Sequence, residues 1–551
     1  MTPRAVPAEV RRAPRRRAAA SVAALLFVVA ALSAGAGARQ AAAGPAALTP
    51  RAASVSRAAL TPRAASVTFA GPLASAAPAG RASVSAARLS ARERAASAVL
   101  AAQRTRFLRR YSATPGAPFT RLFATWRAEL HRSAVYRSLR AMPKGGLLHV
   151  HATSTGAATW IADRALAEPD CFIFWGPTND TYVHGQVKVF PAASGRAPPD
   201  GWQPIADVAA TEPNLRAQLV ELFTLGPQDA SATDIWTEFE AAMQRVDEFI
   251  TYRPVFLAYY TDTLLRMARE GVGFVEVRTT VAAVTAEDGR TIADHGVLEL
   301  WRIVLAAVRS RYPDFDLRLV ICGFRWSSVA QVAAQMDRAL ALRTSDPDLV
   351  AGFDLIGRED GDNSNAFYAA VLRPDTMGTP PLPLILHSGE SLSPDDHNVG
   401  EALALGASRI GHGLNMGLFP GLEDDLRAAG VTVEVCPLSN QGLRYVTDLR
   451  RHPARGWLRR GLRCALSSDD PAIFGSTELS DDFAAAYLAW GLDLGALKRL
   501  ALDSIHGSTL PAQDKQRQLK LFDVRWRRWV TNVGASAGAH AATPASALSP
   551  R

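Results

Sequence analysis

Short apolar runs recur through the middle of the chain, and most of them end in a polar or charged residue. Runs of this kind are typical of buried β-strands. They read "LLHVH" (147–151), "FVEVR" (274–278), "LRLVICG" (317–323), "AGFDLIG" (351–357), "LPLILH" (382–387), "RIGHG" (409–413), "VTVEVCP" (431–437) and "RCALSSDD" (463–470). Most of the intervals between them have a helical pattern, such as "VLELWRIVLAAVRSRY" at 297–312. Apolar strands that alternate with helices predict a parallel sheet with helices on both faces.

Eight such strands predict an α/β fold, namely a closed (β/α)8 or TIM barrel. An open doubly wound sheet is the main alternative, but no GxGxxG follows the first strand. The interval 152–273 is too long for one crossover helix, so we expect an insertion at about 170–235, where Pro, Gly and Asp are frequent. The barrel is expected to span 141–535, and residues 91–140 are expected to form a helical segment in front of it.

The two ends of the chain differ in composition from the middle. At 1–38 an arginine-rich start, a diluted apolar run and a small-residue site at 36–38 predict a cleaved signal peptide and a secreted protein without stable membrane insertion. An organelle transit peptide is the alternative, because Arg, Ala and Ser stay abundant beyond this segment. The leader 39–90, which repeats "ALTPRAASV", and the tail 536–551 have little to bury, so we expect both to be disordered.

The net charge of +9 is concentrated at the N-terminus. Residues 1–94 hold fourteen Arg and two Glu, so the remainder carries a net charge of −3. This balance argues against a nucleic-acid partner. The cysteines show no CxxC spacing, which favours buried thiols over disulfides or a zinc cluster. The sequon Asn179-Asp180-Thr181 predicts N-glycosylation and fits a secreted chain.

Side chains that can bind a metal stand at the ends of four of the eight predicted strands. They are His149 and His151 on the first strand, His387 on the fifth, His412 on the sixth and Asp469 with Asp470 on the eighth. The carboxyl ends of barrel strands share one rim, so these groups can converge there. Three imidazoles and a carboxylate with an open position suit a catalytic zinc ion. A single histidine at a strand end is usually a satisfied core residue, but the coincidence at four strands favours a metal site.

The motifs around these strand ends form a longer pattern. "MPKGGLLHVH", "HSGE", "RIGHG", "VEVCPLSNQGLRYVTDLRRHP" and "LSSDDPAIFG" resemble the adenosine deaminase superfamily, most closely its secreted branch, the adenosine deaminase-related growth factors. The resemblance extends over roughly 95–535. It implies one Zn²⁺ per subunit and hydrolytic deamination of adenosine, and of 2′-deoxyadenosine, to inosine and ammonia. It also implies a homodimer formed through 91–140, with a cell-surface receptor or glycan as a further partner.

The resemblance also implies roles for individual residues. The positions that match the family's zinc ligands are His149, His151, His387 and Asp469. Glu390 matches the proton donor of HxGE, and His412 matches the histidine that handles the attacking water. For Glu390 to act as an acid, burial has to keep its pKa raised.

Four further positions match substrate-binding residues of the family. Asp470 matches the substrate-contacting aspartate, and Gly357 in "DLIGRED" matches the glycine whose backbone meets the purine ring. Trp236 and Glu240 lie one helical turn apart in "IWTEFEAAM" and resemble the segment that closes over the nucleoside. Packing of Trp236 in the core is an equal alternative.

The chain departs from the family where the substrate is recognised. Ala152 stands where the family has an aspartate that reaches the ribose, and Phe324 or Arg325 stands near a histidine that is common in the growth-factor branch. Loss of a hydrogen bond to a substrate hydroxyl alters discrimination between substrates. The branch also has a disulfide in the insertion, whereas Cys171 has no cysteine near it in the sequence.

Other interpretations stay open at this stage. Glu390 can be a carboxylate at a helix N-terminus, and Asp470 before Pro471 can be a helix cap. The enzyme can act on another 6-aminopurine nucleoside, or the chain can be a receptor-binding growth factor without catalysis, although a pure binder does not need Glu390. Zinc hydrolases of cyclic amides have a bridging lysine on a middle strand, and "DLIGRED" offers none.

Overall fold

The computed structural model describes residues 89–114, 116–373 and 381–541. The expected signal peptide, nearly all of the expected leader and the last ten residues of the tail lie outside the described residues. Eight parallel strands form the centre of the fold. They are β1 (Gly145–His151), β5 (Val272–Thr279), β8 (Asp316–Phe324), β9 (Val350–Ile356), β10 (Ile385–Ser388), β11 (Arg409–His412), β12 (Thr432–Val435) and β13 (Arg463–Leu466). The parallel α/β fold predicted from the apolar runs is confirmed.

The strands form two sheets that meet at both edges. One sheet has the order β1-β5-β8-β9 and the other has the order β10-β11-β12-β13. A parallel bridge between Phe353 and Leu384 joins β9 to the start of β10, and a second bridge between Val150 and Asp469 joins β1 to the segment after β13. These two bridges close the eight strands into a barrel in chain order, as the sequence predicts.

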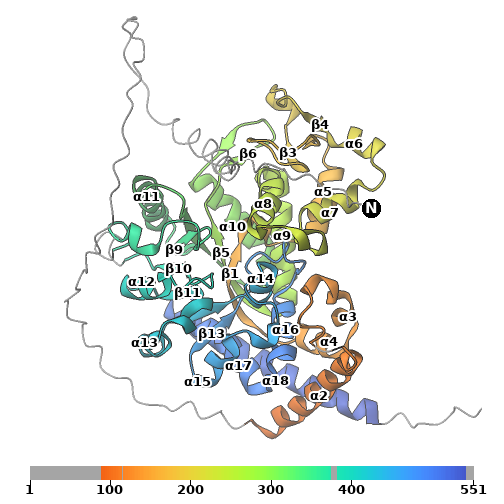
Figure 1. Cartoon of the computed structure of the whole chain (residues 1–551), viewed down its shortest axis with the longest axis vertical. Coiled ribbons are helices and arrows are strands. Elements are labelled where there is room, and N and C mark those ends of the chain that lie inside the picture. The colour runs from red at the N-terminus through yellow and green to blue at the C-terminus, as the bar shows by residue number, and fades with distance from the viewer. Residues whose placement is uncertain (1–88, 115, 374–380, 542–551) are drawn as a thin grey trace, which may run out of the picture. The chain divides into compact units, whose positions relative to one another are not determined.

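Helices surround the barrel strands (Figure 1). The helices of the barrel and its rim are α5 (Ala158–Ala167), α8 (Ile235–Ile250), α9 (Arg253–Arg269), α10 (His295–Arg309), α11 (Val329–Ser345), α12 (Asn398–Ala404), α13 (Leu422–Ala429), α14 (Pro437–Gly442), α15 (Ala454–Arg460), α16 (Leu479–Trp490) and α17 (Leu494–Gly507). In α10 the buried residues Val297, Trp301, Val304 and Val308 recur with the helical period, so one face of the helix is apolar. Trp301 packs on Tyr260 of α9, with ring centroids 4.2 Å apart.

The N-terminal segment packs beside the C-terminal helix. It contains α2 (Ala91–Leu108), α3 (Arg127–Arg132) and α4 (Ala134–Arg140), and the last helix is α18 (Ala512–Ala541). Ser90 and Glu93 form a capping box at the start of α2. Glu93 also pairs with Lys498 and accepts a hydrogen bond from the Trp526 indole, each at 2.9 Å. Because of these contacts, α2 is part of the same core as the barrel helices. Dimerisation through this segment stays a prediction.

The long interval after β1 contains a small separate sheet. Its antiparallel strands have the order β3-β2-β4, with β2 at Cys171–Phe174, β3 at Gln186–Val189 and β4 at Trp202–Pro204. Helices α6 (Ile205–Thr211) and α7 (Leu215–Leu222) follow it. Residues 179–182 form a turn in which the Asn179 N–H donates to the Tyr182 carbonyl at 2.9 Å. Asn179 is exposed, and its glycosylation stays a prediction.

Two further findings concern the cysteines and the helices of the chain. Cys171, Cys322, Cys436 and Cys464 are all buried free thiols, as expected. Within residues 89–541, gaps aside, no helix combines the length and the apolarity that crossing a bilayer requires.

Candidate metal centre and active site

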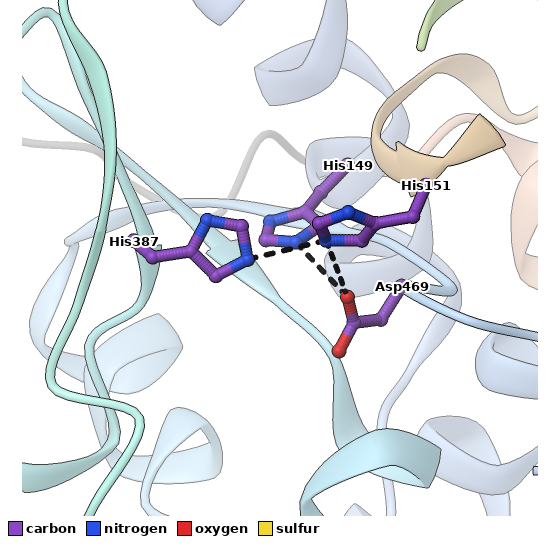
Figure 2. Close-up of side chains that lie close together, drawn as sticks. All are labelled: His149, His151, His387 and Asp469. Atoms are coloured by element: carbon purple, nitrogen blue, oxygen red, sulfur yellow. Dashed lines mark hydrogen bonds and ion pairs between the residues drawn. The ribbon is translucent and has the colours of Figure 1, made fainter. Parts of the chain in front are cut away.

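Four side chains from three distant parts of the chain converge at the carboxyl rim of the barrel. Figure 2 shows the imidazoles of His149, His151 and His387 with the Asp469 carboxylate, directed at one another. Their ligand atoms all lie within 4.8 Å of one another. Asp469 Oδ1 is 3.1 Å from His149 Nε2 and 3.2 Å from His151 Nε2, and the Nε2 atoms of His151 and His387 are 3.2 Å apart (Figure 2).

The backbone pairing that closes the barrel brings the histidines of β1 and Asp469 together. The Asp469 N–H donates to the His149 carbonyl at 3.1 Å, and the His151 N–H donates to the Asp469 carbonyl at 3.0 Å. Val150 lies between the two histidines and is fully buried, so the alternation of strand β1 turns both imidazoles to the same side. Asp469 has a φ of 59°, a left-handed conformation that costs about 1–3 kcal/mol in a residue other than glycine. Strain of this kind is tolerated where the surroundings fix a functional geometry.

Carboxylates behind two of the histidines fix the orientation of their rings. His149 Nδ1 is 3.0 Å from Glu434 Oε2, and His387 Nδ1 is 2.7 Å from Asp354 Oδ2. Each carboxylate accepts the Nδ1 proton, so the Nε2 lone pair of each ring is directed into the cluster. Nε2 of His149 is buried; it lies 3.1 Å from Asp469 Oδ1 but makes no hydrogen bond of regular geometry to any described residue. Unprotonated imidazole nitrogens beside a carboxylate are a donor set that fits a divalent metal ion such as zinc.

The interior of the barrel below the cluster contains buried charges. Arg278 joins the two carboxylates, with 2.6 Å to Asp354 Oδ2 and 2.6 Å to Glu434 Oε2. Arg409 joins Glu434 at 2.5 Å to Glu276 at 2.6 Å. Burial acts to raise the pKa of Glu434, but Arg278, Arg409 and the bond to His149 lower it well below its ordinary value. The network therefore holds an ionised carboxylate against a histidine of the cluster.

Asp469 is ionised for a similar reason. Burial acts to raise its pKa, but the histidines around it, His149 first, lower that pKa well below its ordinary value. For His387, burial lowers the pKa to about 3 despite the favourable charge of Asp354. The protein groups alone thus favour a carboxylate at Asp469 and a neutral imidazole at His387, which are the protonation states of metal ligands.

Glu390 and His412 lie next to the cluster. Glu390 follows β10 and is 4% exposed, and its Oε1 makes no hydrogen bond to any residue that the structure describes. Burial, followed by the negative charges of Asp469 and Glu359, raises the pKa of Glu390 well above its ordinary value. A carboxyl group that stays protonated at neutral pH can act as an acid.

His412 ends β11 with a φ of 65° and is fully buried. Its Nδ1 is 3.4 Å from Glu390 Oε1, and its Nε2 is 3.8 Å from Asp469 Oδ2. Burial lowers the pKa of His412 well below its ordinary value, so the imidazole is neutral and can accept a proton. Asp470 is also buried, and its Oδ1 accepts a hydrogen bond from the Ser154 hydroxyl.

The remaining candidates lie in two other segments. Gly357 directly follows β9 and has a φ of 121°, and a Cβ there would lie 2.9 Å from the Trp326 ring, so only glycine fits. Trp236 lies on α8, where it packs against Phe239 in a small apolar cluster and donates from its indole to the Tyr445 hydroxyl at 2.8 Å. Glu240, one turn along, is exposed. Among the described residues, no hydrogen bond or ion pair joins Trp236 or Glu240 to the cluster.

The sequence patterns did not indicate the groups that support the cluster. They include Asp354, Glu434, Arg278, Arg409 and Glu276 in the barrel interior, and Glu359 beside the turn of Glu390. Glu276, Asp354 and Glu434 are charged positions inside apolar runs, and that is the signal that identifies them. Arg278 and Arg409 stand at the ends of such runs. A charge in a fully buried strand needs a partner, so such positions indicate a buried network.

Comparisons with known proteins agree with this geometry. The family described as adenosine deaminase matches residues 228–524. Adenosine deaminase 2-A of Danio rerio is 31% identical over 417 residues, which cover 73% of this chain and 82% of that protein. Adenosine deaminase 2 of Sus scrofa is 31% identical over 423 residues, with the same coverage of 73% and 82%.

Solved structures of related enzymes share the fold. The N6-mAMP deaminase of Arabidopsis has a TM-score of 0.52 at 18% identity, covering 70% of this chain and 99% of that chain. The ADAL–IMP complex has a TM-score of 0.53 at 18% identity and covers 71% and 99%. At this identity the two structures support the barrel fold alone. The sequence matches go further: the chain belongs to the adenosine deaminase family, and within it to the adenosine deaminase 2 branch.

Proposed function

We propose that this enzyme is a zinc-dependent adenosine deaminase that converts adenosine to inosine and ammonia. The observation that carries the proposal is the convergence of His149, His151, His387 and Asp469 on one point, with the protonated Glu390 next to it. These four residues would hold the ion. When bound, a zinc ion lowers the pKa of a water molecule from about 15.7 to about 7 and so supplies a nucleophile at neutral pH.

Glu390 would supply the proton that makes the purine reactive. The C6 carbon accepts an oxygen nucleophile poorly until N1 of the ring is protonated. Glu390 keeps its proton because it is buried near other carboxylates, and its Oε1 is free of hydrogen bonds to described residues. The carboxyl group would donate to N1 as a water oxygen adds to C6. One proton of that water would pass to the amino group, which leaves as ammonia when its bond to C6 breaks, and the other would restore the Glu390 carboxyl group. General acid catalysis of this kind contributes about 10²–10⁴-fold.

His412 and Asp470 would handle the other protons. His412 is neutral and lies 3.4 Å from Glu390 Oε1, so it can accept a proton from the attacking water and orient that water toward C6. Asp470 is fixed by the Ser154 hydroxyl, and burial with the charge of Asp469 raises its pKa well above its ordinary value. It would hold N7 of the purine or the leaving amino group.

The base would lie against the backbone of Gly357, which has no side chain in the way. Trp236 and Glu240 would line the outer part of the site from α8. Trp236 is held in place by Tyr445, so we expect it to form a wall, with Glu240 closer to solvent.

The identity of the nucleoside substrate has less support than the deamination reaction. Relatives in the adenosine deaminase 2 branch support adenosine. Ala152 offers no carboxylate after the metal-binding pair, which favours a test of ribose-modified and N6-modified substrates as well. The experiment is a panel of adenosine, 2′-deoxyadenosine, N6-methyladenosine and AMP, followed by absorbance, with metal content measured on the same sample. Turnover of adenosine with one zinc per chain supports the proposal; turnover of another nucleoside alone, or activity without metal, overturns it.

We further propose that the enzyme is secreted and acts as a homodimer. The N-terminal pattern of the sequence supports secretion, and the family resemblance, which implies dimerisation through 91–140, supports the homodimer. Detection of the protein in the culture medium, starting near residue 39, and its mass in solution test the two statements. Retention in an organelle or a monomer at working concentration would overturn them.

A further inference from the structure

The turn that carries Glu390 is held from outside the strand by a second glutamate. We propose that Glu359 is a positioning residue, whose carboxylate grips the backbone of Gly389 and Glu390 and thereby aims the Glu390 carboxyl group at the substrate. The inference rests on the proposed function in one respect, the role of Glu390 as the acid. The grip itself is visible in the structure.

Glu359 binds both peptide N–H groups of the turn. Its Oε2 accepts from the Gly389 N–H at 2.8 Å, and its Oε1 accepts from the Glu390 N–H at 2.9 Å. Oε2 also accepts from the Asn398 side-chain amide at 2.8 Å. Three donors surround a side chain that is only 6% exposed, so both oxygens accept hydrogen bonds. Burial raises the pKa of Glu359 to about 7, although the charge of Arg325 and the two peptide N–H groups act to lower it. Hydrogen bonds from peptide groups to a charged acceptor are stronger than neutral ones.

The opposite side of the turn is closed by packing. Gly389 has a φ of 80°, and a Cβ at this position would lie 2.5 Å from Asn415 Oδ1 and 2.7 Å from Val399. The turn therefore lies between these side chains and the Glu359 carboxylate. The Asn415 N–H also donates to the Gly389 carbonyl at 3.2 Å, so the turn is held on this side through its carbonyl. Its two N–H groups are bound by Glu359, which therefore fixes their direction.

Glu359 also connects the acid to the segment that would meet the purine. It lies two residues beyond Gly357, in the loop after β9. The same short segment would thus contact the base and hold the turn of the proton donor. A shift of one relative to the other would separate Glu390 from N1, and misplacement by about 1 Å can cost about 100-fold in rate.

The variant Glu359→Gln tests this role. A glutamine keeps the size of the side chain, but its amide has one oxygen and one NH₂ group, and the NH₂ group has to face one of the two peptide N–H groups. We expect kcat to fall about 100-fold, KM to change less than about threefold and zinc content to stay at the wild-type value. We also expect the amides of 388–392 to exchange with deuterium at least about tenfold faster.

Glu270 offers a matched control. It is buried like Glu359 and accepts two consecutive peptide N–H bonds, from Leu479 at 3.0 Å and from Ser480 at 2.9 Å. It lies just before β5 begins, at the other end of that strand from the metal cluster. Glu270→Gln removes the same kind of contact, so it should speed exchange at 479–480 and lower stability while kcat and exchange at 388–392 stay unchanged.

The outcomes separate the two proposals. The positioning role is overturned if Glu359→Gln leaves exchange at 388–392 unchanged, if its kcat stays within about threefold of wild type, or if Glu270→Gln lowers kcat equally. If the wild type deaminates a different nucleoside, the substrate assignment fails and the same variants are compared on that substrate. If the wild type deaminates no nucleoside, the proposed function fails, and exchange at 388–392 still decides whether Glu359 holds the turn.

Discussion

Replacement of Glu434 by Gln should weaken metal binding, although Glu434 itself would not contact the ion. Glu434 is not a ligand, but its Oε2 accepts from His149 Nδ1 at 3.0 Å and from Arg278 at 2.6 Å, and its Oε1 accepts from Arg409 at 2.5 Å. Its negative charge makes the His149 imidazole a better donor through Nε2 and fixes the ring. A glutamine amide keeps the shape of the side chain, but it has no charge and only one acceptor oxygen.

The size of the effect follows from these contacts. Removal of a carboxylate that orients a metal-binding histidine typically costs 10- to 100-fold in metal affinity, or about 1.4–2.7 kcal/mol. Loss of one partner of a buried ion pair also lowers the free energy of unfolding, by about 3–5 kcal/mol. Stability should therefore fall in any variant that breaks the buried network, whereas metal affinity should fall only where a ligand histidine is affected.

Glu276 distinguishes the two effects. It is fully buried and binds Arg409 at 2.6 Å, but its other oxygen binds Thr509 and not a histidine. Glu276→Gln should lose comparable stability in urea unfolding while its zinc affinity, measured by competition with a coloured chelator, changes less than about threefold. Equal loss of zinc affinity in Glu434→Gln and Glu276→Gln, or unchanged affinity in both, would refute the role of Glu434 in orienting the His149 imidazole.

Three further outcomes are expected. Glu390→Gln should lower kcat by about 10²–10⁴-fold with zinc content unchanged, since the amide cannot donate a proton as an acid; wild-type turnover by this variant would contradict the role. His452 is buried and its pKa is lowered to about 3. In the unfolded chain His452 binds a proton below about pH 6.5, whereas in the folded protein it stays neutral down to about pH 3. The free energy of unfolding therefore falls as the pH falls, by about 2 kcal/mol at pH 5. His452→Gln should show a smaller loss in urea unfolding than wild type or the exposed control His397→Gln, and equal losses would contradict this. A thiol reagent should label no cysteine in the native protein and four after unfolding, and rapid native labelling would contradict their burial.

The sequence could predict the barrel because its strands are predominantly apolar on both faces, with few charged residues between their ends. Runs such as "LPLILH" therefore stand out, and their polar ends indicate the rim where His387 and its partners meet. The closure of the barrel rests on single bridges at Val150 and Phe353, and no periodicity predicts those. The roles of the residues at the rim stay proposals, although their convergence follows from the topology.

The contacts of the residues that surround the site could not be predicted from the sequence pattern. Glu359 lies in a loop without periodicity, and its contacts with Gly389 and Glu390 depend on how two loops pack. Trp236 fits an amphipathic helix whether it faces a substrate or the core, and only the packing shows that it bonds to Tyr445. Arg325, near the position where the branch has a histidine, is fully buried and donates to the His387 carbonyl, a placement that depends on tertiary contacts.

The pairing of His149 and His151 with the backbone of Asp469 has a consequence for biosynthesis. These partners are more than 300 residues apart, so a ribosome must have released nearly the whole barrel before they can meet. A nascent or truncated polypeptide that ends before Asp469 lacks both the contact that closes the barrel at β1 and the carboxylate of the cluster. The complete set of four side chains should therefore form only late in synthesis, when Asp469 is available.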